Sequence, residues 1–540
     1  YPENTELVYS NFTPRSGKYY KGELDKVVFF GLQYFIKNVL IDTFNEEFFN
    51  QTLDKVLSDY KRIIKNCLFV ENPDTSHIES LHKLGYLPLE VKALDEGSLV
   101  NYQIPVLTVV NTLPEFFWLT NYIETAMSAD LWMLSNNATL AYEYKQICNK
   151  YADITCDNKE HLPFQCHDFS FRGMPGIESA TASGMSHLLS FQGTDTVPSI
   201  MALEYYYDAD VTKELVGCSI AASEHSVMCS GGKEDEYGTY KRFITELYPI
   251  GLVSIVSDTW DFFGVLTNIL PRLKSDIMSR DGKVVIRPDS GNPSDIICGA
   301  YDLIITEEEL KIIKNTEGRI FTKEEYKRNN KIYNILSNHI YKDTFTEDSK
   351  FVFKDKTGKY YKIYYDNFYG SCSLGDEIAE VEFKGAIELL WETFGGTVNE
   401  KGYKVLDPHI GLIYGDSITL ERAEEIFKRL EAKGFASSNV LYGVGSFSYC
   451  FNTRDSQGWA MKATYVEVNG QGRDIFKQPK TDSGKNSAKG LLRVEKLNND
   501  YILHDQQSWE QEKQSELTTV FKDGVLTKQT TLAEIRQKLS

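Results

Sequence analysis

Short apolar runs that end in polar or glycine residues alternate with amphipathic stretches between about residues 165 and 455. Few polar residues interrupt the apolar runs, which is typical of strands buried on both faces of a parallel sheet. The segment 420–433 (LERAEEIFKRLEAK) instead spaces its apolar residues three or four apart, as an amphipathic helix does. The alternation predicts an α/β fold, either a barrel or a doubly wound sheet. The predicted strands are residues 187–193, 253–258, 283–289, 410–416 and 439–445.

Other regions of the chain depart from this alternation. Residues 305–405 contain a charged, helix-like segment at 307–338 and a predicted β-hairpin at 351–368, which turns at Thr357-Gly358. We therefore expect an insertion between two barrel strands. The two chain ends carry short strands, and we expect them to form one β-rich domain. The predicted domains are residues 1–135 plus 456–540, β-rich, and 136–455, an α/β barrel interrupted at about 305–405.

The composition restricts the class of protein. With 540 residues, 42% hydrophobic and 25% charged, the chain is typical of a globular protein of more than one domain. Its formal net charge of −19 argues against a nucleic-acid partner. No stretch approaches the roughly 18 consecutive apolar residues of a membrane helix, so no membrane partner is expected. Nine scattered cysteines without a C-x-x-C pair predict reduced thiols and a cytoplasmic location.

The predicted strands are followed by sequences rich in aspartate and glycine: FQGTDT, IVSDTWD, IRPDSGNP, IYGDS and YGVGS. Each alone is compatible with an ordinary turn or helix cap. Ligands of barrels and open α/β sheets bind at the carboxyl ends of strands, so five such sequences predict a site. Arg287 offers a fork of donors for phosphate, and Asp289 can bind a ribose hydroxyl or organise a cation. Glycines such as Gly415 and Gly445 let backbone N–H groups approach a phosphate.

His225 is the histidine with a chemical context among the nine in the chain. Glu224 and Asp258 are both candidates to orient its imidazole. A basic stretch at 473–493 is either a solvated loop or a local anion site. The residues alone predict a cytosolic α/β enzyme that binds phosphates, a ribose-like polyol and a planar group near Phe169. They leave the reaction open.

Seven motifs, in order and approximate spacing, closely resemble those of the nicotinamide phosphoribosyltransferases, which belong to the type II phosphoribosyltransferase family. The likeness extends over nearly the whole chain apart from 305–405. It implies an irregular α/β barrel beside a β-rich domain, and a homodimer with active sites at the subunit interface. The motifs are DFSFRG (168–173), GTDT (193–196), ASEHS (222–226), VSD (256–258), IRPDSGNP (286–293), GD (415–416) and TRD (453–455).

The resemblance also implies the reaction. The phosphoribosyl group of phosphoribosyl pyrophosphate would pass to nicotinamide, giving nicotinamide mononucleotide and pyrophosphate for NAD salvage. Mg²⁺ would assist, and ATP would act as a stimulating co-substrate through a phosphorylated histidine, His225, oriented by Glu224 or Asp258. We expect the partners to be nicotinamide, phosphoribosyl pyrophosphate, ATP and a second copy of the chain.

Further roles follow at matching positions. Phe169 would stack on the pyridine ring, and Asp195 would accept a hydrogen bond from the carboxamide nitrogen. An ionised aspartate only accepts hydrogen bonds, so it favours an amide and repels a carboxylate. Asp289 would bind the ribose hydroxyls and steady the cationic sugar of the transition state. The remaining substrate-binding residues would be Arg172, Arg287, Gly415, Asp416, Gly445, Ser446, Lys462, Lys477 and Arg454, the last reaching across the dimer.

Two departures from the family and three alternatives accompany this hypothesis. Ser446 stands where the family has a glycine. The family carries a second stacking aromatic residue ahead of the position of Tyr1, and we expect such a segment to precede Tyr1 in the full protein. The alternatives are a nicotinate phosphoribosyltransferase, against which Asp195 argues, an ATP-independent enzyme, and a non-catalytic binding protein on the same fold.

Overall fold

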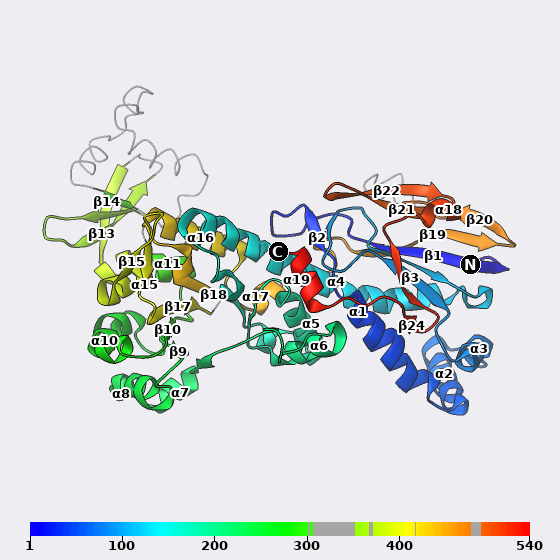
Figure 1. The fold of residues 1–540 in the computed structure, drawn as a ribbon, viewed down its shortest axis with the longest axis horizontal. Coiled ribbons are helices and arrows are strands. Elements are labelled where there is room, and N and C mark those ends of the chain that lie inside the picture. Colours follow the sequence, from blue (N-terminus) through cyan, green and yellow to red (C-terminus); the bar gives the residue numbers. More distant parts are fainter. Residues whose placement is uncertain (301–302, 306–350, 367–370, 416, 477–487) are drawn as a thin grey trace, which may run out of the picture. The chain divides into compact units, whose positions relative to one another are not determined.

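The computed structural model describes residues 1–300, 303–305, 351–366, 371–415, 417–476 and 488–540. Contacts divide the chain into two units, which are taken in turn (Figure 1). Unit 1 comprises residues 1–146, 166–219 and 444–540, and unit 2 comprises residues 147–165 and 220–443. This division follows different boundaries from the predicted domains, because residues 166–219 have most of their contacts within the unit that holds both chain ends.

Unit 1 contains an antiparallel sheet to which both chain ends contribute. The strand order is β20-β19-β1-β5-β3-β23-β24. In the register, Tyr9 of β1 lies opposite Tyr465 of β19, and Val91 of β3 lies opposite Phe521 of β23. The strands run over β1 (Thr5–Thr13), β3 (Leu89–Ala93), β5 (Leu107–Asn111), β19 (Ala460–Val468), β20 (Gln471–Asp474), β23 (Thr518–Lys522) and β24 (Val525–Leu526).

Apolar side chains of this sheet form the main core of unit 1. Phe12 of β1 and Trp459 are both fully buried, and their rings stack with centroids 4.8 Å apart. The short strands predicted near the carboxyl end are therefore confirmed. Their apolar residues pack in one core with those of the strands near the amino terminus. Smaller pairs are β2 (Lys26–Val28) with β4 (Leu99–Asn101) and β21 (Leu491–Leu497) with β22 (Asp500–Gln507).

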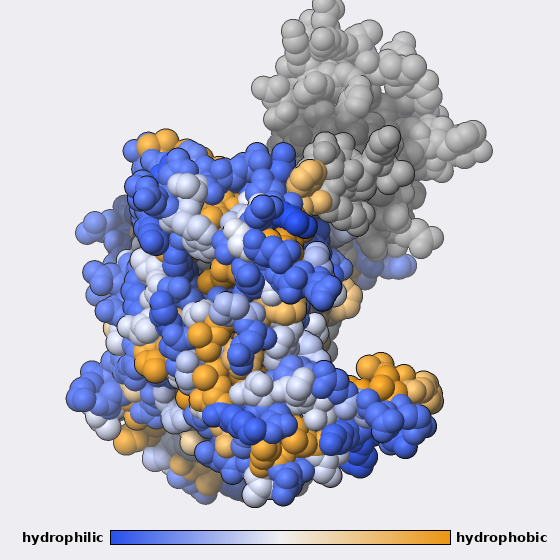
Figure 2. All heavy atoms as spheres, turned by 90° about the vertical axis from the view of Figure 1, so that its right-hand side faces the viewer, coloured by the Kyte–Doolittle hydropathy of each residue, from blue (hydrophilic) through white to orange (hydrophobic). Residues whose placement is uncertain are grey.

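Unit 1 also contains helices and a parallel pair of short strands, β6 (Cys166–Asp168) and β7 (Gly193–Thr194). The face in Figure 2 is largely hydrophilic, in keeping with the net charge, and hydrophobic side chains interrupt it in patches. The helices are α1 (Leu32–Phe35), which continues as a π-helix over Ile36–Thr43, α2 (Leu53–Leu68), α3 (Ser76–Leu84), α4 (Leu119–Thr155, in unit 1 up to residue 146), α5 (Ile177–His187), α6 (Val197–Tyr207), α17 (Ser446–Tyr449), α18 (Trp509–Glu512) and α19 (Leu532–Lys538).

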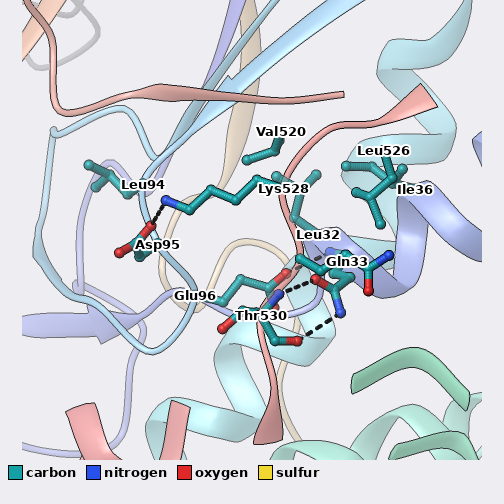
Figure 3. A pocket seen from close by; sticks show the side chains of 11 residues that line it. Leu32, Gln33, Ile36, Leu94, Asp95, Glu96, Val520, Leu526, Lys528 and Thr530 are labelled. Atoms are coloured by element: carbon teal, nitrogen blue, oxygen red, sulfur yellow. Dashed lines mark hydrogen bonds and ion pairs between the residues drawn. The ribbon is translucent and has the colours of Figure 1, made fainter. Parts of the chain in front are cut away.

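The carboxyl-terminal segment is tied to the first helix around a small pocket (Figure 3). Buried Glu96 accepts hydrogen bonds from the backbone N–H groups of Gly31 and Gln33, which the first turn of α1 leaves without helical partners. The Gln33 amide accepts from the N–H of Thr530 and donates to its carbonyl. Lys528 forms an ion pair of 2.6 Å with Asp95. The polar groups around the pocket therefore join segments from opposite ends of the chain.

Unit 2 contains a parallel sheet with strand order β18-β17-β10-β9-β8. Val284 of β10 lies opposite Val253 of β9 on one side and Ile410 of β17 on the other. The inner strands are almost wholly buried, so four of the five predicted strands and the α/β fold class are confirmed. The strands are β8 (Ala221–Ala222), β9 (Val253–Val256), β10 (Val284–Arg287), β17 (Ile410–Tyr414) and β18 (Val440–Val444).

The strand predicted at 187–193 is wrong. His187 is the last residue of α5, and the only strand residue of this run is Gly193, in β7. Leu188, Leu189 and Phe191 are buried, but in a loop that packs in the core of unit 1. A short buried apolar run does not distinguish a strand from such a loop by periodicity alone.

The helices of unit 2 include the predicted helix at 420–433, confirmed as α16 (Leu420–Ala432). The hairpin predicted at 351–368 is confirmed for the residues that are described, with β12 and β13 antiparallel and Gly358 in the turn at φ 91°. The segment 307–338 lies outside the described residues. Further elements are α7 (His225–Ser230), α8 (Glu236–Arg242), α9 (Phe262–Gly264), α10 (Leu270–Met278), α11 (Pro293–Cys298), β11 (Leu303–Ile305), β12 (Phe351–Lys354), β13 (Tyr360–Asp366), β14 (Ser371–Ile378), α15 (Glu380–Phe394), β15 (Gly396–Val398) and β16 (Lys404–Leu406).

The sequence also predicts reduced cysteines and the absence of a membrane helix. Each cysteine whose side chain is described carries a free thiol. In the part of the chain that the structure describes, none of the helices combines the length and the hydropathy that crossing a membrane requires.

Candidate functional site

Asp195 follows β7 and lies at the centre of a polar cluster in unit 1. Its Oδ1 atom accepts a hydrogen bond from His167 Nε2 at 2.8 Å and from the Ser219 hydroxyl at 2.5 Å. The Asp195 backbone N–H donates to the carbonyl of Asp168, which holds the end of β7 beside β6. Phe169 lies next to this cluster, with its ring centroid 4.7 Å from that of His167. The predicted aromatic and amide-binding residues are therefore neighbours.

Arg172 and Ser446 are placed on adjoining segments of unit 1. Arg172 is exposed in a single helical turn over Phe171–Gly173. A Cβ atom on Gly173 would lie only 2.0 Å from the Ser446 hydroxyl oxygen, so the missing side chain of Gly173 makes room for Ser446. Ser446 begins α17 and Gly445 precedes it with open space around its Cα. The serine that departs from the family pattern is thus accommodated.

A pocket of about 320 Å³ in unit 1 gathers three cationic side chains. Arg454 and Lys462 were predicted to bind substrate, and Arg15, from the segment after β1, joins them. Glu124 and Trp132 of α4 also line it. Arg15 is fixed by a 2.8 Å bond from its Nε to the carbonyl of Gly458. Guanidinium and ammonium groups arranged in this way favour a phosphate or pyrophosphate ligand.

His225 and Asp258 form the centre of the cluster in unit 2. His225 begins α7 and is about half exposed, whereas the Asp258 side chain is 6% exposed. Asp258 Oδ1 lies 3.1 Å from His225 Nε2, and Asp258 Oδ2 accepts a 3.0 Å hydrogen bond from the N–H of Asp289. Asp258 therefore orients the imidazole and the strand exit that carries Asp289. Among the described residues, Asp258 contacts His225, while Glu224 is exposed at the start of α7.

Arg287 and Gly415 lie at neighbouring strand exits of the same sheet. Arg287 ends β10 and donates from Nη2 to the carbonyl of Ser223 at 2.7 Å. The N–H of Gly415, after β17, points to the carbonyl of Pro288 at 3.5 Å. Both exits stand at the carboxyl ends of parallel strands, where α/β folds bind ligands. Asp416 and Lys477 lie outside the described residues.

Three residues of these clusters had no motif of their own in the sequence. Arg15 lies far along the chain from Arg454 and Lys462, and the pairing of β1 with β19 and the bond from Arg15 to the Gly458 carbonyl bring their segments together. His167 precedes a recognised motif, and Ser219 lies between two of them. The sequence did contain one sign of His167, because it directly precedes the DFSFRG motif. Had β6 and β7 been recognised as neighbouring parallel strands, His167 would have been expected beside the GTDT motif that carries Asp195.

The sequence between residues 164 and 525 matches the family model described as the nicotinate phosphoribosyltransferase (NAPRTase) family. The chain belongs to this family. A protein named nicotinamide phosphoribosyltransferase from Acinetobacter baylyi is 48% identical over 100% of this chain and 94% of its own length. Proteins of the same name from Mycoplasma pneumoniae and Mycoplasma genitalium are 34% and 30% identical, over 75% and 92% of this chain and 71% and 93% of their own.

Membership of the NAPRTase family confirms the resemblance to the type II phosphoribosyltransferases. It identifies the chain as an enzyme that transfers a phosphoribosyl group. A pocket lined by cationic side chains, a carboxylate beside a planar ring and a histidine–aspartate pair are compatible with that chemistry. In the described residues, no group of three or more His, Cys, Asp and Glu side chains forms a metal site by itself.

Proposed function

We propose that this phosphoribosyltransferase uses nicotinamide as its acceptor and forms nicotinamide mononucleotide and pyrophosphate for NAD salvage. The observation that carries the proposal is the arrangement of Asp195, which receives two hydrogen bonds on Oδ1 and lies beside Phe169. A carboxylate held in this way is an acceptor for an amide N–H and repels the carboxylate of nicotinate. The names of the three relatives support the same acceptor.

The other predicted site residues bind the ribose and the phosphate groups during the transfer. The pyridine nitrogen attacks the anomeric carbon of phosphoribosyl pyrophosphate while the bond from that carbon to the pyrophosphate oxygen breaks. Positive charge develops on the sugar, and the carboxylate of Asp289 stabilises it while binding the ribose hydroxyls. Arg172, Arg287 and the cationic pocket with Arg454 and Lys462 hold the phosphate groups. The leaving pyrophosphate thereby stays bound as its charge increases.

Mg²⁺ is part of the proposal, and the residues fit it. The backbone N–H of Asp289 donates to Asp258 Oδ2, so the two aspartates are neighbours, and carboxylate oxygens are the protein ligands that Mg²⁺ prefers. They would hold the ion together with oxygens of the substrate phosphates. When bound, the ion neutralises charge on the leaving pyrophosphate.

ATP stimulation through His225 is also proposed. A carboxylate only accepts hydrogen bonds, so Asp258 Oδ1 fixes the proton on His225 Nε2 and leaves the lone pair on Nδ1. Nδ1 would attack the γ-phosphorus of ATP, forming an N–P bond as the P–O bond to ADP breaks. The imidazole is 46% exposed, so a nucleotide can reach it.

The resemblance to the family also implies a homodimer in the cytoplasm, and both remain part of the proposal. Val197, Met201 and Tyr205 are spaced four residues apart on α6, directly after Asp195, and are 57%, 67% and 61% exposed. A second copy of the chain would cover this apolar stripe.

The test is product formation from phosphoribosyl pyrophosphate and Mg²⁺, with nicotinamide and nicotinate in parallel, for the unsubstituted enzyme and Asp195→Ser. We expect nicotinamide mononucleotide from the unsubstituted enzyme, and a gain of nicotinate use in Asp195→Ser. Asp210→Ser, in an exposed ion pair of the same unit, is the matched control and should keep the selectivity. Turnover of nicotinate alone would overturn the acceptor. No turnover of either base would contradict the proposed reaction.

A further inference from the structure

Two side chains that the reaction itself does not use hold Asp195 in place. We propose that His167 is a positioning residue, which sets the Asp195 carboxylate at a fixed place relative to Phe169 and so makes the enzyme selective for an amide. Ser219, in the segment that follows α6 and lies alongside β7, also holds the Asp195 carboxylate. The inference rests on the proposed function, because it concerns how the base would be recognised.

The strands place His167 next to Asp195. In the parallel pair β6 and β7, His167 lies opposite Gly193, and Asp168 lies opposite Thr194. A Cβ atom on Gly193 would lie 2.8 Å from His167 Nδ1. The imidazole therefore lies across the neighbouring strand where only a glycine leaves room. From there its Nε2 reaches the carboxylate of Asp195.

The chemistry of the pair fixes its proton. The Asp195 carboxylate only accepts hydrogen bonds, so Nε2 of His167 carries the hydrogen and donates it. The same ring lies against Phe169, with an interplanar angle of 49°. One imidazole therefore contacts both groups that would bind the base, the aromatic ring and the amide acceptor. It sets the spacing between the ring plane and the carboxylate that nicotinamide must match.

Backbone hydrogen bonds of the preceding residue, Cys218, place Ser219 beside Asp195. The N–H of Thr194 donates to the carbonyl of Cys218, and the N–H of Cys218 donates to the carbonyl of Gln192. These bonds align the segment before Ser219 with β7. Its hydroxyl therefore donates to the same oxygen, Asp195 Oδ1, as the histidine does. Two donors from two segments restrict the rotation of the carboxylate.

Exposure explains why this support matters for function. The Asp195 side chain is 45% exposed, whereas that of His167 is 12% exposed. A half-exposed aspartate without such donors samples several rotamers and is solvated by water. Removing the imidazole donor should therefore weaken base binding about 10- to 100-fold, the usual consequence of losing a hydrogen bond to a charged group. Phosphate binding should not change.

The experiment compares two substitutions of His167, one that keeps an aromatic ring without the N–H donor and one that keeps a donor without the ring. His167→Phe keeps a ring against Phe169 but has no N–H donor. His167→Gln keeps a donor, because its amide nitrogen occupies about the place of Nε2, but has no ring. His504→Phe is the matched control, since His504 Nε2 bonds a carboxylate of Glu495 at 2.9 Å in the same unit. The measurements are KM for nicotinamide, KM for phosphoribosyl pyrophosphate, kcat, and the ratio of kcat/KM for nicotinamide over nicotinate.

We expect His167→Phe to raise KM for nicotinamide about 10- to 100-fold and to lower the amide-to-acid ratio, with KM for phosphoribosyl pyrophosphate unchanged. His167→Gln should restore most of the ratio, and His504→Phe should match the unsubstituted enzyme. Equal losses in all parameters would indicate a purely structural role and overturn the inference. So would an unchanged ratio in His167→Phe beside an unsubstituted enzyme that prefers the amide. An unsubstituted enzyme that turns over nicotinate alone would overturn the proposed function as well.

Discussion

At the scale of single residues, Arg15 tests the cationic pocket. Its guanidinium lines the pocket with Arg454 and Lys462, and its bond to the Gly458 carbonyl fixes it there. Arg15→Ala should raise KM for phosphoribosyl pyrophosphate about 10- to 100-fold, the effect of a lost charge-assisted hydrogen bond, and leave KM for nicotinamide unchanged. Steady-state kinetics measure both. Arg62→Ala on α2, an exposed arginine paired with Asp59, should change neither. A rise in the nicotinamide KM alone would contradict the role of the pocket.

His225 and Asp258 permit a separate prediction about ATP. His225→Ala removes the proposed phosphoryl acceptor, so stimulation by ATP should be lost. Asp258→Asn keeps the imidazole but weakens the acceptor that orients it, so the stimulated rate should fall. Rates with and without ATP measure both effects, and phosphorus NMR of the ATP-treated enzyme should show phosphohistidine only where His225 is present. ATP stimulation that survives in His225→Ala would exclude the phosphohistidine role.

The sequence predicted the residues at strand exits and missed those that support them. Asp195, Arg287 and Asp289 stand directly after apolar runs, where pattern and chemistry coincide. Arg15 and His167 owe their position to pairing between strands that are distant in sequence or too short to recognise. Pairing of this kind depends on the register of the folded sheet. Local periodicity does not contain it.

At the scale of elements, His187 links α5, β7 and α17 within unit 1. It ends α5, its Nε2 lies 3.0 Å from the carbonyl of Gly193, and its Nδ1 lies 2.7 Å from the hydroxyl of Tyr449. A carbonyl only accepts, so Nε2 carries the proton and Nδ1 accepts from Tyr449. The segment 187–193, which was predicted as a strand, therefore begins with a buried histidine, His187, that holds β7 and α17 together. Composition alone indicates the burial of such a run and not its backbone conformation.

The burial of His187 predicts how stability depends on pH. Burial lowers the pKa of His187 to about 4, whereas a histidine in the unfolded chain titrates near 6.5. Between these values the unfolded chain binds a proton that the folded one does not, so the free energy of unfolding falls as pH drops from about 6.5 to about 4. His187 should contribute about 3 kcal/mol to that loss.

Urea unfolding between pH 7 and pH 4, for the unsubstituted protein and His187→Gln, measures this contribution. The variant should be less stable at pH 7 but should lose less stability on acidification. NMR titration of the His187 ring in the unsubstituted protein gives a reading independent of how well the variant folds. A ring that titrates near 6.5 in the folded protein would contradict the prediction.

At the scale of the whole molecule, both chain ends stabilise the unit that carries the proposed base-binding cluster. The register of β1 with β19 and β3 with β23 makes one sheet from segments at the two ends of the sequence. The motifs placed the chemistry along the chain, but the assignment of 166–219 to the same unit as the ends was not foreseen. That assignment depends on long-range packing. A change that destabilises the carboxyl-terminal segment should therefore also weaken binding of the base at Asp195, which lies far from it in sequence.

The last helix, α19, gives the test of that coupling. Leu532, Ile535 and Leu539 are at most 2% exposed in a core of unit 1, and each such side chain contributes about 1.5–3 kcal/mol by burial. Arg536 donates to the carbonyls of Leu188, Leu215 and Val216. The last two residues precede Ser219, which donates to Asp195. Loss of α19 should therefore loosen the segment that positions Asp195.

Arg536→Ala is the milder form of this change and should keep the apolar core. We expect a lower melting temperature and a KM for nicotinamide that rises more than KM for phosphoribosyl pyrophosphate. Deletion of residues 531–540 should lower the melting temperature further, because it also removes the three buried side chains. Gln537→Ala, on the same helix, is the control and should change little. If Arg536→Ala lowers the melting temperature but leaves both KM values as they were, α19 stabilises unit 1 without positioning the segment before Ser219. A selective rise in the nicotinamide KM would instead show that the end of the chain acts on base binding through Leu215, Val216 and Ser219.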